Sequence, residues 1–415
     1  MRVALQCALS DVNVDITQTN SQRQLAISLA ALDGEGRNAP LNLCLVLDHS
    51  GSMNGRPLET VKQAACEIVD NLSAGDRLSV VTFDHRAKVL VSNQVVDNPA
   101  AVKAEITQLK ASGGTCIDDG MKVGIEELVK GKQDTISQVF LLTDGENEHG
   151  DDERCLKLAE LAASYNITLN SLGFGDRWNQ DVLEDIADAA SGALTYIEKP
   201  EDAVAEFNKL FTRIQSVALT NAHLILDLHP TCRLAELKPI AQVAPEAVEL
   251  PLIQDGQRCM VRLGDLMIDA QRVVLANLYI GQLAEGTHPL VNVSVRYDDP
   301  GLNQTEIESP AETVMINALA AAAPAPDPVV RTHILALAKY RQTQIAEQKL
   351  KAGDRAAAAT MLQSAAKTAL QMGDQSAATV LQTSATQLQS GRELSDSDRK
   401  RTRIVSKTTL QAPAD

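Results

Sequence analysis

Three short segments of the chain place side-chain oxygens where they could share one ligand. One follows the apolar run LNLCLVL, one follows two consecutive glycines, and one follows the apolar run SQVFLLT. Carboxylates and hydroxyls are the donors that hard divalent cations prefer, and such a site needs no thiolate or imidazole. The sequence therefore predicts a Mg²⁺ site, and the same donors also suit Mn²⁺ or Ca²⁺. The candidate ligands are Asp48, Ser50, Ser52, Thr115 and Asp144.

The charge of this site predicts what the cation would bind next. If Asp48 binds the metal directly and Asp144 acts through a water molecule, the inner shell keeps a net positive charge. Such a cation favours an anionic oxygen supplied from outside. We expect His49 to be an exposed loop residue, because the site needs only oxygen donors. The acidic run from Glu146 to Glu153 is interpreted as the N-terminus of a helix, where negative charge is favourable, with a second cation site as the alternative.

The elements around these segments predict how the oxygens are brought together. Between residues 40 and 216, strand-like apolar runs alternate with segments of helical periodicity. This alternation is typical of an α/β fold, a doubly wound and mostly parallel sheet of the Rossmann-like kind with helices on both faces. Loops at the carboxyl ends of such strands gather at one crevice. Asp48 and Asp144 would follow adjacent central strands, so their carboxylates can converge.

The rest of the chain divides into β-rich and helical segments. Residues 1–38 and 217–317 are predicted to form short strands, which favours an antiparallel β-sandwich module that flanks the α/β domain. The alternative is that residues 1–38 only cap the α/β domain. A Pro/Ala-rich linker at 318–328 leads to helical segments at 329–390, expected to form a hairpin or small bundle. Residues 391–415 are interpreted as a solvated basic and polar tail.

Composition and charge exclude several classes of function. The chain has 415 residues, of which 44% are hydrophobic and 22% charged, as expected for a folded protein of more than one domain. Its formal net charge of −16 and its 3% aromatic residues disfavour binding to nucleic acid or to a membrane surface. The 7 cysteines include no CxxC pair, which argues against a zinc site and fits a reducing compartment. Because no signal-peptide-like or membrane-length apolar run occurs, we expect a soluble, cytoplasmic protein.

The three motifs DHSGS (48–52), GGT (113–115) and TDG (143–145) occur in this order on a βα framework. In order, strand context and separation they resemble the metal-ion-dependent adhesion site (MIDAS) of the von Willebrand factor type A (VWA) domain family, over about residues 40–216. The resemblance implies a Mg²⁺ site completed by an Asp or Glu carboxylate of a protein partner. It assigns Asp48, Ser50 and Ser52 to the first motif, Thr115 to the second and Asp144 to the third. The flanking β regions are similar in layout to inter-α-trypsin inhibitor heavy chains.

These observations lead to one preferred function and two alternatives. We expect a non-catalytic, metal-dependent protein–protein interaction module, with an adhesion or scaffold role, because no general base, nucleophile or cofactor cradle accompanies the metal ligands. One alternative is a regulatory subunit of an AAA+ ATPase-type assembly, which the family resemblance allows. The other is a metal-assisted phosphohydrolase. The haloacid-dehalogenase type of that enzyme would need a second Asp where Ser50 stands, and no GxxxxGK[ST] phosphate loop occurs.

Overall fold

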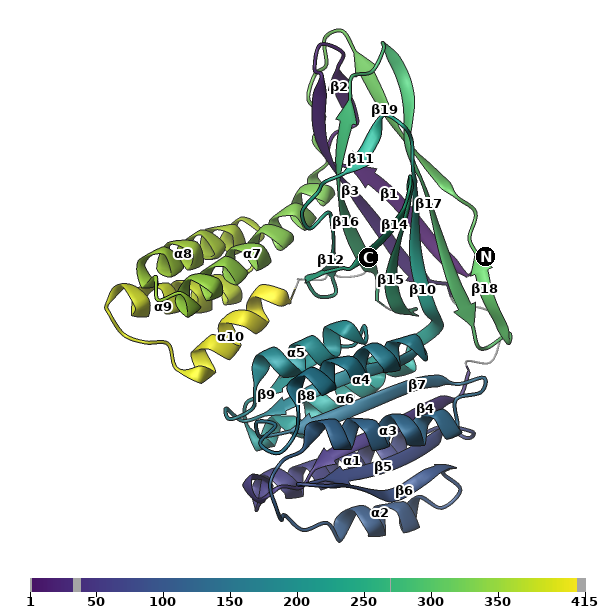
Figure 1. Ribbon diagram of the computed structural model, residues 1–415, viewed down its shortest axis with the longest axis vertical. Helices are drawn as coiled ribbons and strands as arrows, with labels where there is room; N and C mark the ends of the chain where they lie inside the picture. Colours follow the sequence, from purple (N-terminus) through teal and green to yellow (C-terminus); the bar gives the residue numbers. More distant parts are fainter. Residues whose placement is uncertain (1, 33–38, 269, 409–415) are drawn as a thin grey trace.

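The computed structural model describes residues 2–32, 39–268 and 270–408. The chain forms an α/β domain, a β-sandwich and a C-terminal helical domain (Figure 1). The sandwich lies at one end of the molecule and the α/β domain at the other, with the helical domain beside their junction (Figure 1). The predicted fold class is therefore confirmed: a doubly wound, mostly parallel α/β sheet, a flanking antiparallel sandwich and C-terminal helices.

The α/β domain is built on one sheet. Its strands are β4 (Leu41–Asp48), β5 (Arg77–Phe83), β6 (Ala87–Val95), β7 (Ile136–Thr143), β8 (Ile167–Phe174) and β9 (Leu194–Ile197). They hydrogen-bond in the order β6-β5-β4-β7-β8-β9, and all neighbours are parallel except β5 and β6. Every residue of β4 and β7 is buried, as expected for central strands that carry apolar side chains on both faces.

Helices cover both faces of this sheet. They are α1 (Arg56–Asn71), α2 (Pro99–Thr107), α3 (Ile117–Lys130), α4 (Asp152–Ser164), α5 (Gln180–Ala189) and α6 (Ala203–Gln215), with short 3₁₀ turns η1 (Gly51–Met53) and η2 (Pro200–Asp202). Helices α1, α2 and α6 share one core with Leu43, Leu45 and Leu47 of β4. Helices α3, α4 and α5 pack on the other face, around Cys44 and Val46. Successive residues of β4 contact opposite helical layers because side chains along a strand point alternately to the two faces of the sheet.

The strand order creates a crevice at the carboxyl edge of the sheet. From β4 the chain moves outward to β5 and β6, and then returns to β7 on the other side of β4. Loops that leave adjacent strands in opposite directions diverge, which leaves a depression between them. The register places Leu47 opposite Leu142, so the next residues, Asp48 and Thr143, end their strands at the same level. The loops with the predicted ligands therefore meet above β4 and β7.

The N-terminal strands and the strands after the α/β domain form one sandwich. One sheet contains β1 (Val3–Leu9), β3 (Asn20–Ala31), β11 (Cys232–Leu234), β12 (Ile240–Ala244), β13 (Val248–Glu249) and β16 (Arg272–Gly281). The other contains β2 (Asn13–Asp15), β10 (Val217–Leu228), β14 (Leu252–Asp255), β15 (Arg258–Met267), β17 (Gly286–Asp299), β18 (Gln304–Glu308) and β19 (Glu312–Leu319). β3 pairs with β16 from Asn20 opposite Gly281 to Leu29 opposite Arg272. Residues 33–38, part of the predicted first β segment, lie outside the described residues.

A buried carboxylate joins the sandwich to the α/β domain. Asp265 of β15 accepts hydrogen bonds at Oδ2 from Gln138 Nε2 at 2.6 Å and from Thr168 Oγ1 at 2.8 Å. Gln138 and Thr168 belong to the amino-terminal parts of β7 and β8. Burial raises the pKa of Asp265, against the effect of these two hydrogen bonds. The sandwich is thus fixed to the edge of the sheet opposite the crevice.

The C-terminal domain consists of helices α7 (Pro328–Lys351), α8 (Arg355–Gln371), α9 (Gln375–Gln389) and α10 (Asp396–Lys407). Asp327, Asp354 and Asp374 accept hydrogen bonds from the first-turn amides of α7, α8 and α9 as N-caps. Gly353 and Gly373 follow the ends of α7 and α8 with a φ of +80°, a left-handed conformation that favours glycine. No helix within residues 2–32, 39–268 and 270–408 combines the length and apolar character needed to cross a membrane.

The prediction of a solvated tail at 391–415 is wrong for residues 396–407, which form α10 and dock on the α/β domain. Arg403 forms ion pairs with Asp181 and Glu184 of α5, the latter at 2.6 Å, and with Glu347 of α7 at 3.4 Å. Lys407 Nζ lies 3.1 Å from Glu184 Oε1. Arg403 and Lys407, two basic residues of the segment predicted to be solvated, thus neutralise acidic side chains of α5 across the domain boundary. Residues 409–415 lie outside the described residues.

Replacing Arg403 with alanine should loosen α10 while the sheet and the sandwich stay folded. The Arg403 side chain is 12% exposed, and the variant removes the ion-pair partner of Glu347, which is 22% exposed. Removing one partner of a buried ion pair costs about 3 kcal/mol. Amide hydrogen exchange in α10 is therefore expected to be about 100-fold faster in Arg403→Ala than in the wild type, as measured by mass spectrometry.

Arg399→Ala is the matched control for this experiment. Arg399 is exposed on the same helix and forms no ion pair within the part of the chain that the structure describes. Its replacement should leave exchange in α10 unchanged. If Arg403→Ala exchanged as slowly as the wild type, the ion pairs to α5 and α7 would not be what holds α10 in place.

Candidate metal centre

Four of the five predicted ligands form one hydrogen-bonded group at the carboxyl edge of the sheet. Ser50 and Ser52 lie in the turn after β4, and their Oγ atoms are 3.0 Å apart. The Ser52 hydroxyl donates to Asp144 Oδ1 at 2.6 Å, and Asp144 directly follows β7. The Ser50 backbone amide donates to Asp48 Oδ1 at 2.7 Å. These contacts join the first motif to the third.

Asp48 lies deepest in this group and is 0% exposed. The Thr143 hydroxyl donates to its second oxygen, Oδ2, at 2.6 Å. Among the described residues, no Lys, Arg or His side chain forms an ion pair with Asp48. Burial raises the pKa of Asp48 to about 6, against the opposing effect of the hydrogen bonds from Thr143 and Ser50. A buried carboxylate without a protein cation favours a bound cation, because an uncompensated buried charge is costly.

Thr115 joins the group from the loop before α3. It is 3% exposed, and a Cβ placed on Gly145 would lie 3.2 Å from its Oγ1, so the hydroxyl lies against the residue that follows Asp144. The Gly51 amide donates to the Gly113 carbonyl at 3.0 Å, which ties the first motif to the second. Gly113 has a φ of +72°, a conformation that a residue with a side chain rarely adopts. All three motifs therefore meet.

The donor set fits a hard divalent cation. Two neighbouring ligands of an octahedral Mg²⁺, each about 2.1 Å from the ion, lie about 3.0 Å apart. The Oγ atoms of Ser50 and Ser52 have this separation. Ser52 is exposed and Asp144 partly exposed, so the group is open on this side. Burial raises the pKa of Asp144, and the Ser52 hydrogen bond and the charge of Arg177 oppose that rise.

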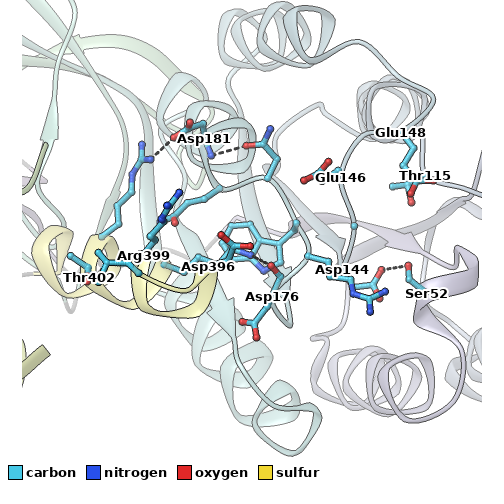
Figure 2. Close-up of a pocket in the computed structure, with 18 of the residues that line it drawn as sticks. Ser52, Thr115, Asp144, Glu146, Glu148, Asp176, Asp181, Asp396, Arg399 and Thr402 are labelled. Atoms are coloured by element: carbon cyan, nitrogen blue, oxygen red, sulfur yellow. Dashed lines mark hydrogen bonds and ion pairs between the residues drawn. The ribbon is translucent and has the colours of Figure 1, made fainter. Parts of the chain in front are cut away.

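The group opens into a cavity of about 950 Å³ between the α/β domain and the helical domain. We call this cavity the interdomain cleft. Figure 2 shows Ser52, Thr115 and Asp144 on one side of it and Arg399, from α10, on the opposite side, with Asp176 between them. We call the five predicted ligands (Asp48, Ser50, Ser52, Thr115 and Asp144) the metal group. Any ligand that reaches this group through the cleft passes residues of both domains.

A second group of potential ligands, at the start of α3, is explained without a metal. Cys116, Asp118 and Asp119 lie close together. Arg154 Nη1 lies 2.7 Å from Asp118 Oδ2 and 3.3 Å from Asp119 Oδ1, so both carboxylates have a protein cation. Burial raises the pKa of the Cys116 thiol to about 11, which keeps it protonated and a poor metal ligand.

His49 and the acidic run from Glu146 to Glu153 lie near the predicted ligands. His49 Nδ1 lies 3.1 Å from the Lys110 carbonyl, so the ring is engaged by the loop backbone. In the acidic run, Asp151 accepts hydrogen bonds from the amides of Glu153 and Arg154 as the N-cap of α4. The run therefore does begin a helix, as interpreted from the sequence.

Two contributors to the site are absent from the predicted ligand set. Thr143 orients Asp48, and the sequence signal for this role was a hydroxyl directly after the apolar residues VFLL (139–142) of the strand. Arg399 lines the cleft because residues 396–407 are helical. The signal for that helix was Ser395 three residues before Asp398, a helix N-cap pattern, and in the structure the Asp398 amide donates to Ser395 Oγ at 3.1 Å.

Comparison with known proteins places these domains in families. The family model for the von Willebrand factor type A domain matches residues 42–210, and the one described as Sll0103-like, C-terminal alpha-helical domain matches residues 328–412. The chain is 58% identical to protein sll0103 of Synechocystis sp. over 415 residues, which covers 100% of this chain and 99% of that protein. It is 29% identical over 206 residues to inter-alpha-trypsin inhibitor heavy chain H3 of Rattus norvegicus, covering 46% of this chain and only 23% of that protein.

Solved structures share the arrangement of the whole chain. A von Willebrand factor type A protein from Catenulispora acidiphila aligns with a TM-score of 0.84 at 17% identity, covering 99% of this chain and 97% of that chain. The ArnB paralog VWA2 from Sulfolobus acidocaldarius aligns with a TM-score of 0.59 at 16% identity, covering 98% of each chain. At these identities the likeness concerns the fold alone. Residues 42–210 thus form a VWA domain, and the chain belongs to the Sll0103-like family of VWA-domain proteins.

Proposed function

We propose that this protein is a non-catalytic, metal-dependent protein-interaction module with an adhesion or scaffold role. Asp48, Ser50, Ser52, Thr115 and Asp144 would hold Mg²⁺, or Mn²⁺ or Ca²⁺ on the same donors. An Asp or Glu carboxylate of a protein partner would complete the shell of the cation. The observation that carries the proposal is the buried Asp48 carboxylate, which no protein cation neutralises within the described residues.

The charge of the donor set explains why the outside ligand is expected to be anionic. When bound, the cation supplies positive charge and open coordination positions. Ser50, Ser52 and Thr115 offer neutral hydroxyls, so Asp48 and Asp144 are the only formal negative charges of the predicted set. If one of the two carboxylates acts through water, the inner shell stays positive. A carboxylate from a partner then neutralises it.

Two further observations support an interaction role over a catalytic one. VWA domains commonly mediate protein–protein interactions, and the family match over residues 42–210 extends that expectation to this chain. A nucleophilic serine needs an adjacent base that takes its proton, most often an imidazole. Here the Ser52 hydroxyl donates to Asp144, and the Ser50 and Ser52 hydroxyls bond to each other. Within the described part of the chain, neither serine is bonded to an imidazole, which supports a role for them as ligands.

Calorimetric titration of the metal-free protein with Mg²⁺ should show binding at a single site. Asp48→Asn keeps the shape of the buried side chain but removes its charge, and Ser52→Ala removes one hydroxyl at an exposed position. Each variant is expected to bind Mg²⁺ at least about tenfold more weakly than the wild type. Loss of a metal ligand, or of a residue that orients one, lowers metal affinity by about this factor or more.

Asp255→Ala, which removes an exposed carboxylate on the sandwich, is the control for charge and should bind Mg²⁺ like the wild type. Thermal unfolding of each variant checks that it is folded. Equal Mg²⁺ affinity in the wild type, Asp48→Asn and Ser52→Ala would reject the site.

Affinity capture from the native cells should show a partner whose retention depends on the cation. The wild-type bait is expected to hold this partner in Mg²⁺ and to release it in EDTA, and the Asp48→Asn bait should not hold it in either buffer. The role of the captured protein then separates a scaffold function from the AAA+ ATPase alternative. Prey that binds both baits equally and ignores EDTA would contradict the proposal.

A further inference from the structure

The interdomain cleft has two walls. The metal group lies in one of them, and the helical domain forms the other. Ser52 and Asp144 line the metal end of the cleft, and Arg399 and Thr402 of α10 line the opposite wall (Figure 2). Its volume of about 950 Å³ lies at the upper end of the range for sites that enclose a small molecule. A folded partner domain would need a much wider contact, since a stable interface buries about 800 Å² on each partner. A cavity of this size therefore suits an extended segment of a few residues.

Most basic side chains of the cleft already have partners in the protein. Arg403 and Lys351 both form ion pairs with Asp181, the latter at 2.9 Å. Lys400 donates to the Asp176 carbonyl, and its Nζ lies 4.2 Å from the centre of the Trp178 ring. These cations hold the two domains together and do not offer their charge to a ligand.

Arg399 is different. It is exposed, it lines the cleft, and its side chain forms no ion pair or hydrogen bond within residues 2–32, 39–268 and 270–408. Asp396 precedes it by one turn of α10 but is not within ion-pair distance of it. Arg177 is also exposed and lies on the cleft, with its charge acting on Asp144. Arg177 and Arg399 are thus cleft arginines without an ion pair among the described residues, although the exposed carboxylates of Asp176 and Asp396 also line the cleft.

The acidic residues of the cleft set a direction for an anionic ligand. Glu146 and Glu148 are exposed and lie on the Thr115 side of the metal group (Figure 2). They repel a second negative charge placed there. On the other side the same charge is attracted only where it lies directly on Arg177 or Arg399, because Asp176 and Asp396 also line the cleft there. A ligand with two acidic groups is therefore best accommodated when its second group contacts one of these arginines.

We infer that the partner reaches the cation through an extended acidic segment, a tail or an exposed loop, that lies in the interdomain cleft. One carboxylate of the segment completes the cation, and a second one pairs with Arg399 of the helical domain. The inference rests on the proposed function and adds to it the form of the partner and a recognition role for α10. An arginine can bind the second carboxylate through two parallel N–H···O bonds.

Selection of peptides from a phage-displayed library of random 12-mers tests this inference. The immobilised full-length protein is loaded with Mg²⁺, and bound phage are eluted with EDTA. We expect the eluted peptides to carry two acidic residues. The affinity of one labelled peptide is then measured by fluorescence anisotropy against the wild type, Arg399→Ala, Asp48→Asn and Arg392→Ala. Arg392 is an exposed arginine of the same domain that does not line the cleft, so its replacement is the control.

The expected result is binding that is three- to tenfold weaker in Arg399→Ala, unchanged in Arg392→Ala and lost in Asp48→Asn. A peptide whose second acidic residue is changed to Gln should no longer distinguish Arg399→Ala from the wild type. The inference is overturned if EDTA elutes no peptides, or if they bind the wild type and Arg399→Ala equally while Mg²⁺ still binds the wild type. Peptides that bind Asp48→Asn as well as the wild type would instead reject the proposed function.

Discussion

Asp48 is a carboxylate buried at the end of a central strand, and no protein cation lies beside it among the described residues. The cost of burying this charge governs the arrangement of the groups around it. Asp48 is fully shielded from water, and its hydrogen bonds from Ser50 and Thr143 only partly offset the cost of burying its charge. The charge could be removed by a proton or balanced by a cation. The surrounding hydroxyls, which are neutral and correctly spaced oxygen donors, favour the cation.

The rest of the fold keeps this group in place from both ends of the sheet. Gln138 lies near the amino end of β7 and donates to Asp265 of the sandwich. Asp144 directly follows the carboxyl end of the same strand. The sandwich therefore braces the strand that Asp144 follows. On the open side, Arg403 and Lys407 fasten α10 to α5 and leave a cleft above the predicted metal ligands. The metal group is thus a recess between two domains.

The sequence predicted the parts of this arrangement that depend on local patterns. Apolar runs as regular as LNLCLVL define central strands, and the polar residues directly after them must lie at the carboxyl edge, so the convergence of Asp48 and Asp144 followed from strand order. The helix caps at Asp354 and Asp374 also depend on a local pattern, a glycine directly before the capping residue. These features are set by neighbours in the chain.

The features that the sequence did not reveal depend on partners far away in it. Arg403 and Lys407 belong to a segment whose high charge is typical of a solvated tail. The acidic side chains that make its burial favourable lie far away in the sequence, on α5 more than 200 residues earlier and at Glu347 of α7. The role of Asp265 required knowing that β15 meets the amino ends of β7 and β8. The interdomain cleft could not be predicted without the docking of α10.

Whether one hard cation binds where the three motifs meet can be observed in the protein itself. Crystals of the protein grown with Mn²⁺ test it most directly, because the anomalous signal of manganese locates the ion independently of the protein. We expect one strong anomalous peak bounded by the hydroxyls of Ser50, Ser52 and Thr115, with Asp48 and Asp144 in contact directly or through water. A folded protein with no peak there, or with its peak elsewhere, would contradict this expectation.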